Sequence, residues 1–145
     1  MAEKVFTSEA EQVKIIVKHY KSLGYDVTTE VANMNQYVDI VAIKDGLVTC
    51  IEAKLRDWKR VVKQCEPHVF VADYVYIVIG TKTVSTGLIE SAKEKGYGVI
   101  HCSMWDGKIK MVLESIKHTK YWIPQREVFL KGFYESKECW KNHVK

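Results

Sequence analysis

The spacing of apolar residues divides the chain into segments with a helical period and segments with strand-like character. In residues 8–23 the apolar positions Val13, Ile16 and Tyr20 recur at helical spacing, and Gly24 follows as a C-terminal stop. Apolar stretches bounded by turn residues predict strands further along. The predicted elements are strands at 25–31, 37–43 and 47–55, a helix at 58–69, a strand at 74–79, a helix at 85–95, strands at 98–104 and 108–113, and a last helix from 124 to about 142.

This order mixes hairpins with crossover connections. It predicts an α/β fold in which a central mixed β-sheet is flanked by helices, with an αβββαβ core and a C-terminal helical extension over residues 118–145. The chain has 145 residues, enough for one compact core and too few for two. We therefore expect residues 1–145 to form a single domain.

A tight turn brings two acidic residues together. Asp45-Gly46 between apolar runs is typical of a two-residue hairpin, in which Lys44 lies opposite Leu47 and position 39 lies opposite position 52. Asp39 and Glu52 would then face each other with Cβ atoms about 5 Å apart, which destabilises two carboxylates unless something neutralises them. Lys54 projects from the same strand face as Glu52 because side chains alternate along a strand.

The neighbours of this acidic pair are strongly apolar, so we expect the pair to be half buried. Oxygen ligands of this kind suit Mg²⁺ or Mn²⁺, which take one or two protein carboxylates together with water and substrate phosphate oxygens. The alternative is that Asp39 merely begins a strand and that Glu52 and Lys54 form a solvent-facing ion pair. The second carboxylate at the matching hairpin position favours a site.

These residues resemble the PD-(D/E)XK nuclease superfamily. The matching motif is Val38-Asp39, twelve further residues, and then Glu52-Ala53-Lys54. The resemblance covers residues 8–79, including the capped first helix, the hairpin and the strand at 74–79, whereas the rest is similar mainly in organisation. Similarity is greatest to the archaeal Holliday-junction resolvase-like and RecB-like branches. The resemblance implies a restriction-endonuclease-like fold and metal-dependent hydrolysis of DNA.

The resemblance also implies roles for individual residues. Asp39, Glu52 and the backbone carbonyl of Ala53 would hold Mg²⁺ or Mn²⁺, and Lys54 would assist the nucleophile. Many members add a glutamate from the first helix. Glu9 is preferred because its spacing places it on the helix face directed at the sheet, whereas the alternative, Glu11, completes an S-x-x-E capping box with Ser8.

Gln64 matches the glutamine that RecB-like members carry on the helix after the lysine, and it is a further candidate for catalysis. The tyrosine that usually follows four residues later is replaced here by His68. We consider two interpretations of His68, a contact with phosphate and a structural role.

Basic residues follow the candidate site, and the formal net charge of +4 is compatible with a polyanionic partner. We expect DNA as the partner, with RNA as an open alternative. Trp58 would either stack on a base or pack in the core. A second cluster at 117–126 would guide DNA or line a homodimer interface. The expected nucleic-acid contacts are Arg56, Trp58, Lys59, Arg60 and Lys63.

Other features exclude several classes of protein. No apolar stretch is long enough for a membrane helix, and residues 1–6 do not resemble a secretory signal, so we expect a cytoplasmic protein without a membrane partner. Four widely spaced cysteines argue against a zinc or iron–sulfur site and predict buried thiols. The alternatives to a nuclease are a noncatalytic binding module of the same fold and a subunit that assembles through its C-terminal helix.

Overall fold

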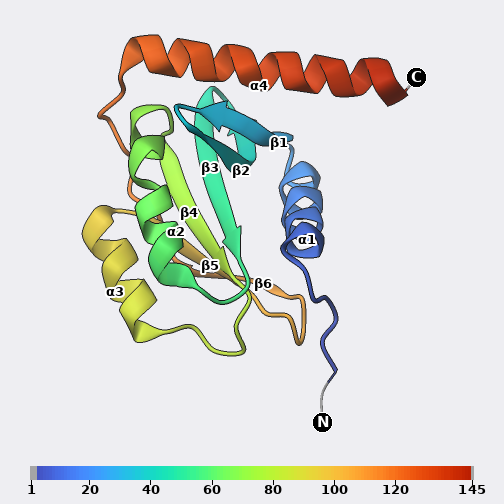
Figure 1. The fold of residues 1–145 in the computed structure, drawn as a ribbon, viewed down its shortest axis with the longest axis vertical. Helices are drawn as coiled ribbons and strands as arrows, with labels where there is room; N and C mark the ends of the chain where they lie inside the picture. Colours follow the sequence, from blue (N-terminus) through green and yellow to red (C-terminus); the bar gives the residue numbers. More distant parts are fainter. Residues whose placement is uncertain (1–2, 145) are drawn as a thin grey trace.

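The computed structural model describes residues 3–144 of the chain, and the side chains of its last helix as far as residue 136. Figure 1 shows a central sheet with helices on both sides. The elements, in chain order, are α1 (Glu9–Ser22), β1 (Asp26–Asn33), β2 (Gln36–Lys44), β3 (Leu47–Lys54), α2 (Trp58–Gln64), the 3₁₀ helix η1 (Glu66–Phe70), β4 (Tyr74–Ile79), α3 (Thr86–Lys95), β5 (Gly98–Cys102), β6 (Ile109–Leu113) and α4 (Ile123–Val144).

The strands of the described region form one mixed sheet in the order β1-β2-β3-β4-β5-β6. The pairs β1–β2, β2–β3 and β5–β6 are antiparallel, whereas β3–β4 and β4–β5 are parallel. Hairpins join the antiparallel pairs, and helices provide the crossovers that parallel neighbours require. The predicted α/β class, with a mixed sheet flanked by helices, is confirmed.

Helix α1 covers one face of the sheet. Ser8 is its N-cap and accepts a hydrogen bond from the Glu11 amide at 3.1 Å. Ile16 and Tyr20 on its inner side are buried in a cluster that includes Ile40, Ile51 and other sheet residues. The apolar period of the sequence therefore corresponds to the face of the helix that packs on the sheet.

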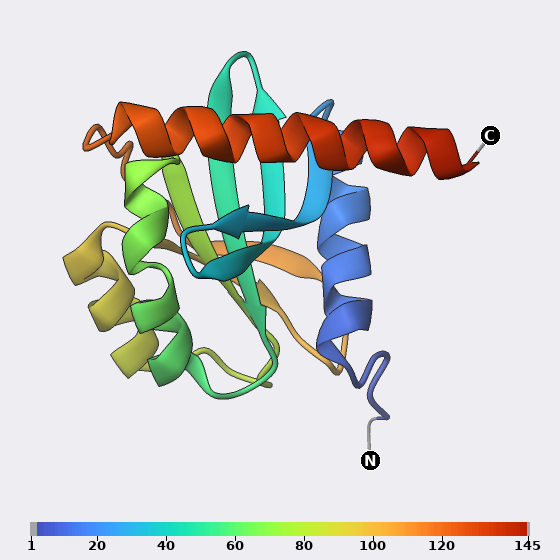
Figure 2. The same cartoon turned by 45° about the horizontal axis from the view of Figure 1, so that its top comes forward.

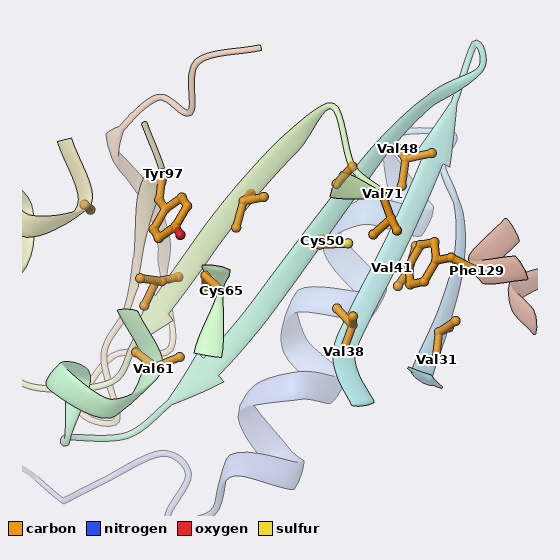
Figure 3. Packing of buried hydrophobic residues seen from close by; sticks show 14 of the residues in the cluster. Val31, Val38, Val41, Val48, Cys50, Val61, Cys65, Val71, Tyr97 and Phe129 are labelled. Carbon is orange, nitrogen blue, oxygen red and sulfur yellow. The ribbon is translucent and has the colours of Figure 1, made fainter. Parts of the chain in front are cut away.

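The opposite face carries α2, η1, α3 and α4. Figure 3 shows part of its core, in which Val41 and Cys50 of the sheet lie near Val71 and Phe129. Helix α4 contacts β1 and η1 and lies across one end of the molecule (Figure 2), with Phe129 and Phe133 fully buried. Cys50, Cys65 and Cys102 are buried free thiols, as predicted; the side chain of Cys139 lies outside the described part.

The single helix predicted for residues 58–69 is wrong. It is divided into α2, which ends at Gln64, and the 3₁₀ helix η1, in whose first turn Pro67 lies. Proline has no amide hydrogen to continue an α-helix, so the chain changes to the tighter 3₁₀ form. This break places His68 with its side chain fully buried in the protein.

No helix within residues 3–144 is long and apolar enough to cross a membrane.

Candidate functional site

The register between β2 and β3 is the one that the Asp45-Gly46 turn predicts. Both turn residues have positive φ angles, +54° and +78°, which two-residue hairpins favour. Pairing runs from Lys44↔Leu47 to Ile40↔Ile51. The next position sets Asp39 beside the end of β3, where its Oδ2 accepts a hydrogen bond of 2.8 Å from the Ala53 amide.

Asp39 also lies where the β1–β2 ribbon bends. Thr29 pairs with Ile40 and Val31 with Val38, but Glu30 between them has a φ of +56°. Beyond the bend the ribbon end passes beneath α4 (Figure 2), so Val38 and Ile40 contribute to different hydrophobic clusters although strand alternation would place them on one face. Asp39, between them, is half buried.

Glu52 is almost completely buried, with 4% of its surface exposed. Its Oε1 lies 2.9 Å from Nε2 of His68, which is itself 0% exposed. His68 Nδ1 in turn lies 2.9 Å from Asn33 Nδ2. The candidate glutamate is therefore held by a buried chain of polar side chains.

Burial raises the pKa of both site carboxyls to about 7, well above their ordinary values. For Asp39 burial is the largest cause, followed by the hydrogen bond with Glu52 and the negative charge of Glu52. For Glu52 burial is again the largest cause, and its hydrogen bond with Asp39 and the charge of Lys54 oppose the increase in pKa. The two carboxyls interact directly and titrate as a pair. The positive charge of Lys54 opposes the increase in the pKa of both carboxyls.

His68 does not reach the surface, so the interpretation as a phosphate contact is wrong. Burial lowers the pKa of its imidazole to about 4, and the negative charge of Asp39 opposes this change. The ring is consequently neutral near pH 7 and acts within the protein, on Glu52. The sequence offered one sign of this contact, since His68 replaces the tyrosine that usually follows Gln64 by four residues.

The two candidate glutamates of α1 have different surroundings. Glu11 is occupied at the helix start, where its Oε1 accepts a hydrogen bond of 3.1 Å from the Ser8 hydroxyl. Glu9 lines the same groove as Asp39, and its negative charge raises the pKa of Glu52. Of the two glutamates, Glu9 therefore lies on the groove that Asp39 also lines, whereas Glu11 is engaged at the start of the helix.

A groove with a volume of about 1060 Å³ lies between α1 and β1 and includes Glu9 and Asp39 in its lining. Its α1 wall carries Lys14, Lys18 and Lys21, whereas the acids Asp26 and Glu30 lie on the β1 side. Sequence reasoning did not single out these lysines, which line the groove beside Asp39. Their spacing of four and three residues along one helix face was the signal that could have identified them.

The other candidate residues have mixed outcomes. Gln64 is half buried; its backbone carbonyl accepts a hydrogen bond from Gln36, and no described hydrogen bond joins its side chain to Asp39, Glu52 or Lys54. Trp58 packs against the core, and its indole lies against Gly87 of α3, which agrees with the core interpretation. The basic side chains Arg56, Lys59, Arg60 and Lys63 are exposed.

The donors at this site fit a hard divalent cation. Asp39 and Glu52 offer carboxylate oxygens in a partly desolvated place, where two negative charges need neutralising. Among the side chains that the structure describes, no group of three or more His, Cys, Asp or Glu residues is arranged to hold a metal. The two carboxylates suit Mg²⁺ or Mn²⁺, since these ions complete their coordination with water and substrate oxygens.

Comparison with solved structures supports the fold. SPO1766, a protein of unknown function from Silicibacter pomeroyi, matches with a TM-score of 0.72 and 12% identity over 97% of this chain and 93% of its own. An XisH family protein from Nostoc punctiforme matches with a TM-score of 0.50 and 14% identity over 73% of this chain and 98% of its own.

A third structure, the protein of unknown function AF1548, has a TM-score of 0.55 and 18% identity over 65% of this chain, which spans 58% of that longer protein. No family model matches this sequence, and no curated protein matches it. At these identities the likeness is one of fold.

Proposed function

We propose that this protein is a metal-dependent nuclease that hydrolyses phosphodiester bonds of DNA. The observation that carries the proposal is the buried pairing of Asp39 with Glu52 at the end of β3, beside Lys54. Two carboxyls with raised pKa values in direct contact are unfavourable for a purely structural site. They are useful where a bound cation supplies the missing positive charge and also binds a phosphate oxygen of the substrate.

Asp39, Glu52 and the backbone carbonyl of Ala53 would hold Mg²⁺ or Mn²⁺, with Glu9 at the groove side. Asp39 Oδ2 accepts from the Ala53 amide and Glu52 Oε1 faces His68, and the hydrogen bond between the two carboxyls would give way to a cation that binds both. A divalent cation bound there polarises the phosphoryl group and makes water a better nucleophile near neutral pH.

Lys54 supplies the positive charge that belongs to the protein itself. Its positive charge acts on both carboxyls of the pair, and it would stabilise the charge that develops on a phosphate during hydrolysis. In this role Lys54 orients the phosphate or the attacking water and does not form a covalent bond with the substrate.

The groove between α1 and β1 gives the substrate a place beside this chemistry. Lys14 and Lys18 on its α1 wall are exposed and would contact phosphates of a strand that ends at Asp39. Exposed Arg60 and Lys63 on α2 provide a second basic surface. DNA is favoured over RNA by the resemblance of the motif, and both belong in the test.

A cleavage panel tests the proposal. Linear, single-stranded, branched and supercoiled DNA, together with a structured RNA, are incubated with protein and Mg²⁺ or Mn²⁺. We expect cleavage of at least one DNA, its loss with a chelator, and its loss in Glu52→Gln. The matched control Glu90→Gln changes an exposed carboxylate on α3 and should cleave normally.

Equal cleavage by wild type and Glu52→Gln would contradict the proposal. Salt-sensitive DNA binding without any cleavage or metal affinity would instead favour the noncatalytic binding module.

Binding by the inactive Glu52→Gln protein then distinguishes the two basic surfaces. If substrate follows the groove, Lys14→Glu with Lys18→Glu should weaken binding about tenfold and reduce its salt dependence, because about two phosphate contacts are lost. The control pair Arg60→Glu with Lys63→Glu makes the same charge change on α2. A loss confined to the α2 pair would assign the substrate path to α2.

A further inference from the structure

Three hydrogen bonds connect helix α4 with the candidate metal ligand Glu52. Gln125 Nε2 on α4 donates to Asn33 Oδ1 at the end of β1, at 3.2 Å. Asn33 Nδ2 lies 2.9 Å from His68 Nδ1 on η1, and His68 Nε2 lies 2.9 Å from Glu52 Oε1 on β3. The path joins four elements, and all its members are buried except Gln125, which is half buried.

The chemistry of the two ends gives this path one direction. An ionised Glu52 can only accept, so the His68 Nε2 facing it must carry the proton. A neutral imidazole with its proton on Nε2 has a lone pair on Nδ1, which therefore accepts from the Asn33 amide nitrogen. That orientation leaves Asn33 Oδ1 free to accept from Gln125, as observed. Each member donates toward Glu52.

We propose that His68 is a positioning residue that holds Glu52 in the orientation needed to bind a divalent cation, with Asn33 and Gln125 fixing the tautomer of the imidazole. The inference rests on the proposed metal-dependent function. His68 holds one carboxylate oxygen, and a bound cation would take the place of the hydrogen bond between Glu52 and Asp39. Because Gln125 belongs to α4, this C-terminal helix contributes to the cation affinity of a site that it does not line.

Two features argue against simple core packing. If the residue at position 68 served only to fill space beside Glu52, an apolar side chain would be sufficient. Such a side chain would not need hydrogen-bond partners from Asn33 and, through it, Gln125. His118, another buried histidine, has a simpler environment: its Nε2 lies 3.1 Å from the Gly96 backbone carbonyl, and no chain of side chains extends from it among the described residues. His68 instead has a side-chain partner at each nitrogen, and one of these partners is the candidate ligand.

Direct Mn²⁺ binding to the full chain, measured by calorimetry or by electron paramagnetic resonance, tests the inference without using activity. His68→Leu removes the donor and should weaken Mn²⁺ binding by about 10- to 100-fold, the range found for lost partners of metal ligands. His68→Gln keeps an N–H group near the Nε2 position and should recover most of the affinity. The matched control His118→Leu removes another buried histidine and should bind Mn²⁺ as wild type does.

Unchanged Mn²⁺ affinity in folded His68→Leu would overturn the inference, while the loss of binding in Asp39→Ala would still support the proposed function. If wild type binds no Mn²⁺ and cleaves nothing, both fail together. Thermal unfolding of each variant separates lost affinity from lost folding.

A second measurement keeps the inference testable if His68→Leu does not fold. Nitrogen-15 NMR of wild type reports which ring nitrogen carries the proton. We expect the Nε2–H tautomer in the Mg²⁺-bound protein, in which Glu52 is ionised. A proton on Nδ1 in the Mg²⁺-bound protein would reverse the donor direction and overturn the proposal. Gln125→Leu, at a half-buried position, should fold and lower Mn²⁺ affinity by a smaller factor than His68→Leu.

Discussion

Two aspartates lie at opposite ends of β3, and their environments are contrasting. Asp39 accepts a hydrogen bond from the Ala53 amide at the end of the strand, and Asp73 accepts one from the Val48 amide at its start, at 2.8 and 2.7 Å. Yet the pKa of Asp39 is raised to about 7, whereas the pKa of Asp73 is lowered. The same backbone contact therefore accompanies opposite shifts.

The difference arises from the neighbouring side chains. Burial disfavours ionisation of Asp73, but hydrogen bonds from Tyr121 and Val48 and the charge of Arg126, 3.3 Å away, outweigh it. Asp39 faces another acid instead. At the start of β3, the Asp73 carboxylate is stabilised by groups of the protein itself. Its hydrogen bond from Tyr121 ties the segment before α4 to the sheet. The other end is left with excess negative charge, which is expected where a ligand completes the site.

The largest expected effect is on activity at the Asp39 end. Asp39→Asn keeps an oxygen that can accept from the Ala53 amide but removes a cation ligand, so cleavage should fall by at least about 100-fold. Thermal stability of the metal-free protein should not fall, because like-charge repulsion is relieved. Asp106→Asn, a carboxylate change away from the site, is the control. Wild-type cleavage by Asp39→Asn would show that the two ends do not differ in function.

The opposite result is expected at the Asp73 end. Asp73→Ala leaves the Val48 amide and the Arg126 guanidinium without their acceptor, so the free energy of unfolding should fall by about 3 kcal/mol. Urea unfolding measures this loss. Cleavage per folded molecule should be unchanged, since Asp73 does not contact Asp39 or Glu52 in the described structure. A loss below about 1 kcal/mol would mean that Asp73 does not anchor the segment before α4 to the sheet.

The two ends should also respond oppositely to pH. A carboxyl with a raised native pKa binds its proton more tightly when folded, so the Asp39–Glu52 pair stabilises the metal-free protein at low pH, and this contribution is lost as pH rises from about 4 toward 7. Asp73 has a lowered pKa, so its contribution is present above 3.8 and is lost as pH falls below that value.

The contribution of the Asp39–Glu52 pair is measured by thermal unfolding of wild type and Asp39→Asn in the presence of a chelator. The comparison is needed because His68, with its pKa lowered to about 4, gives a stability that increases with pH in part of the same range. The melting temperature should decline less between pH 5 and pH 8 in Asp39→Asn than in wild type. Saturating Mg²⁺ should also make this decline smaller in wild type. Parallel curves for the two metal-free proteins would refute the assignment.

The sequence could predict one half of the site because that half is local. The Asp45-Gly46 turn fixes the register, the register sets Asp39 beside the end of β3, and alternation places Lys54 near the pair. The preference for Glu9 over Glu11 came from the helix period and the capping box, and in the structure Glu9 lines the groove while Glu11 accepts from Ser8. Such arguments involve contacts between residues that are close along the chain.

The contacts of His68 could not be predicted in this way. They depend on Pro67 ending α2, on the bend at Glu30 that turns Asn33 beneath α4, and on the packing of α4 itself. These are tertiary relations among segments as far apart as residues 33 and 125, and no local pattern encodes them. The groove beside Asp39 was missed for the same reason, since its two walls come from separate elements.

The smallest effect is expected from the tyrosine hydroxyl that donates to Asp73. Tyr121→Phe removes only the hydroxyl that donates to Asp73, while the aromatic ring that Arg126 covers at 4.4 Å stays in place. We expect a loss of about 1 kcal/mol, seen as a melting temperature lower by about 2–4 °C, because the Val48 amide and Arg126 still satisfy the carboxylate. The pKa of Asp73 should rise, so acid unfolding should begin at a higher pH than in wild type. Tyr121→Phe could instead lower the free energy of unfolding as much as Asp73→Ala does. The stability at Asp73 would then depend on the tyrosine hydroxyl and not on the charge of Arg126. In that case Asp73 and Asp39 would differ in their hydrogen bonds rather than in the charge of their neighbours.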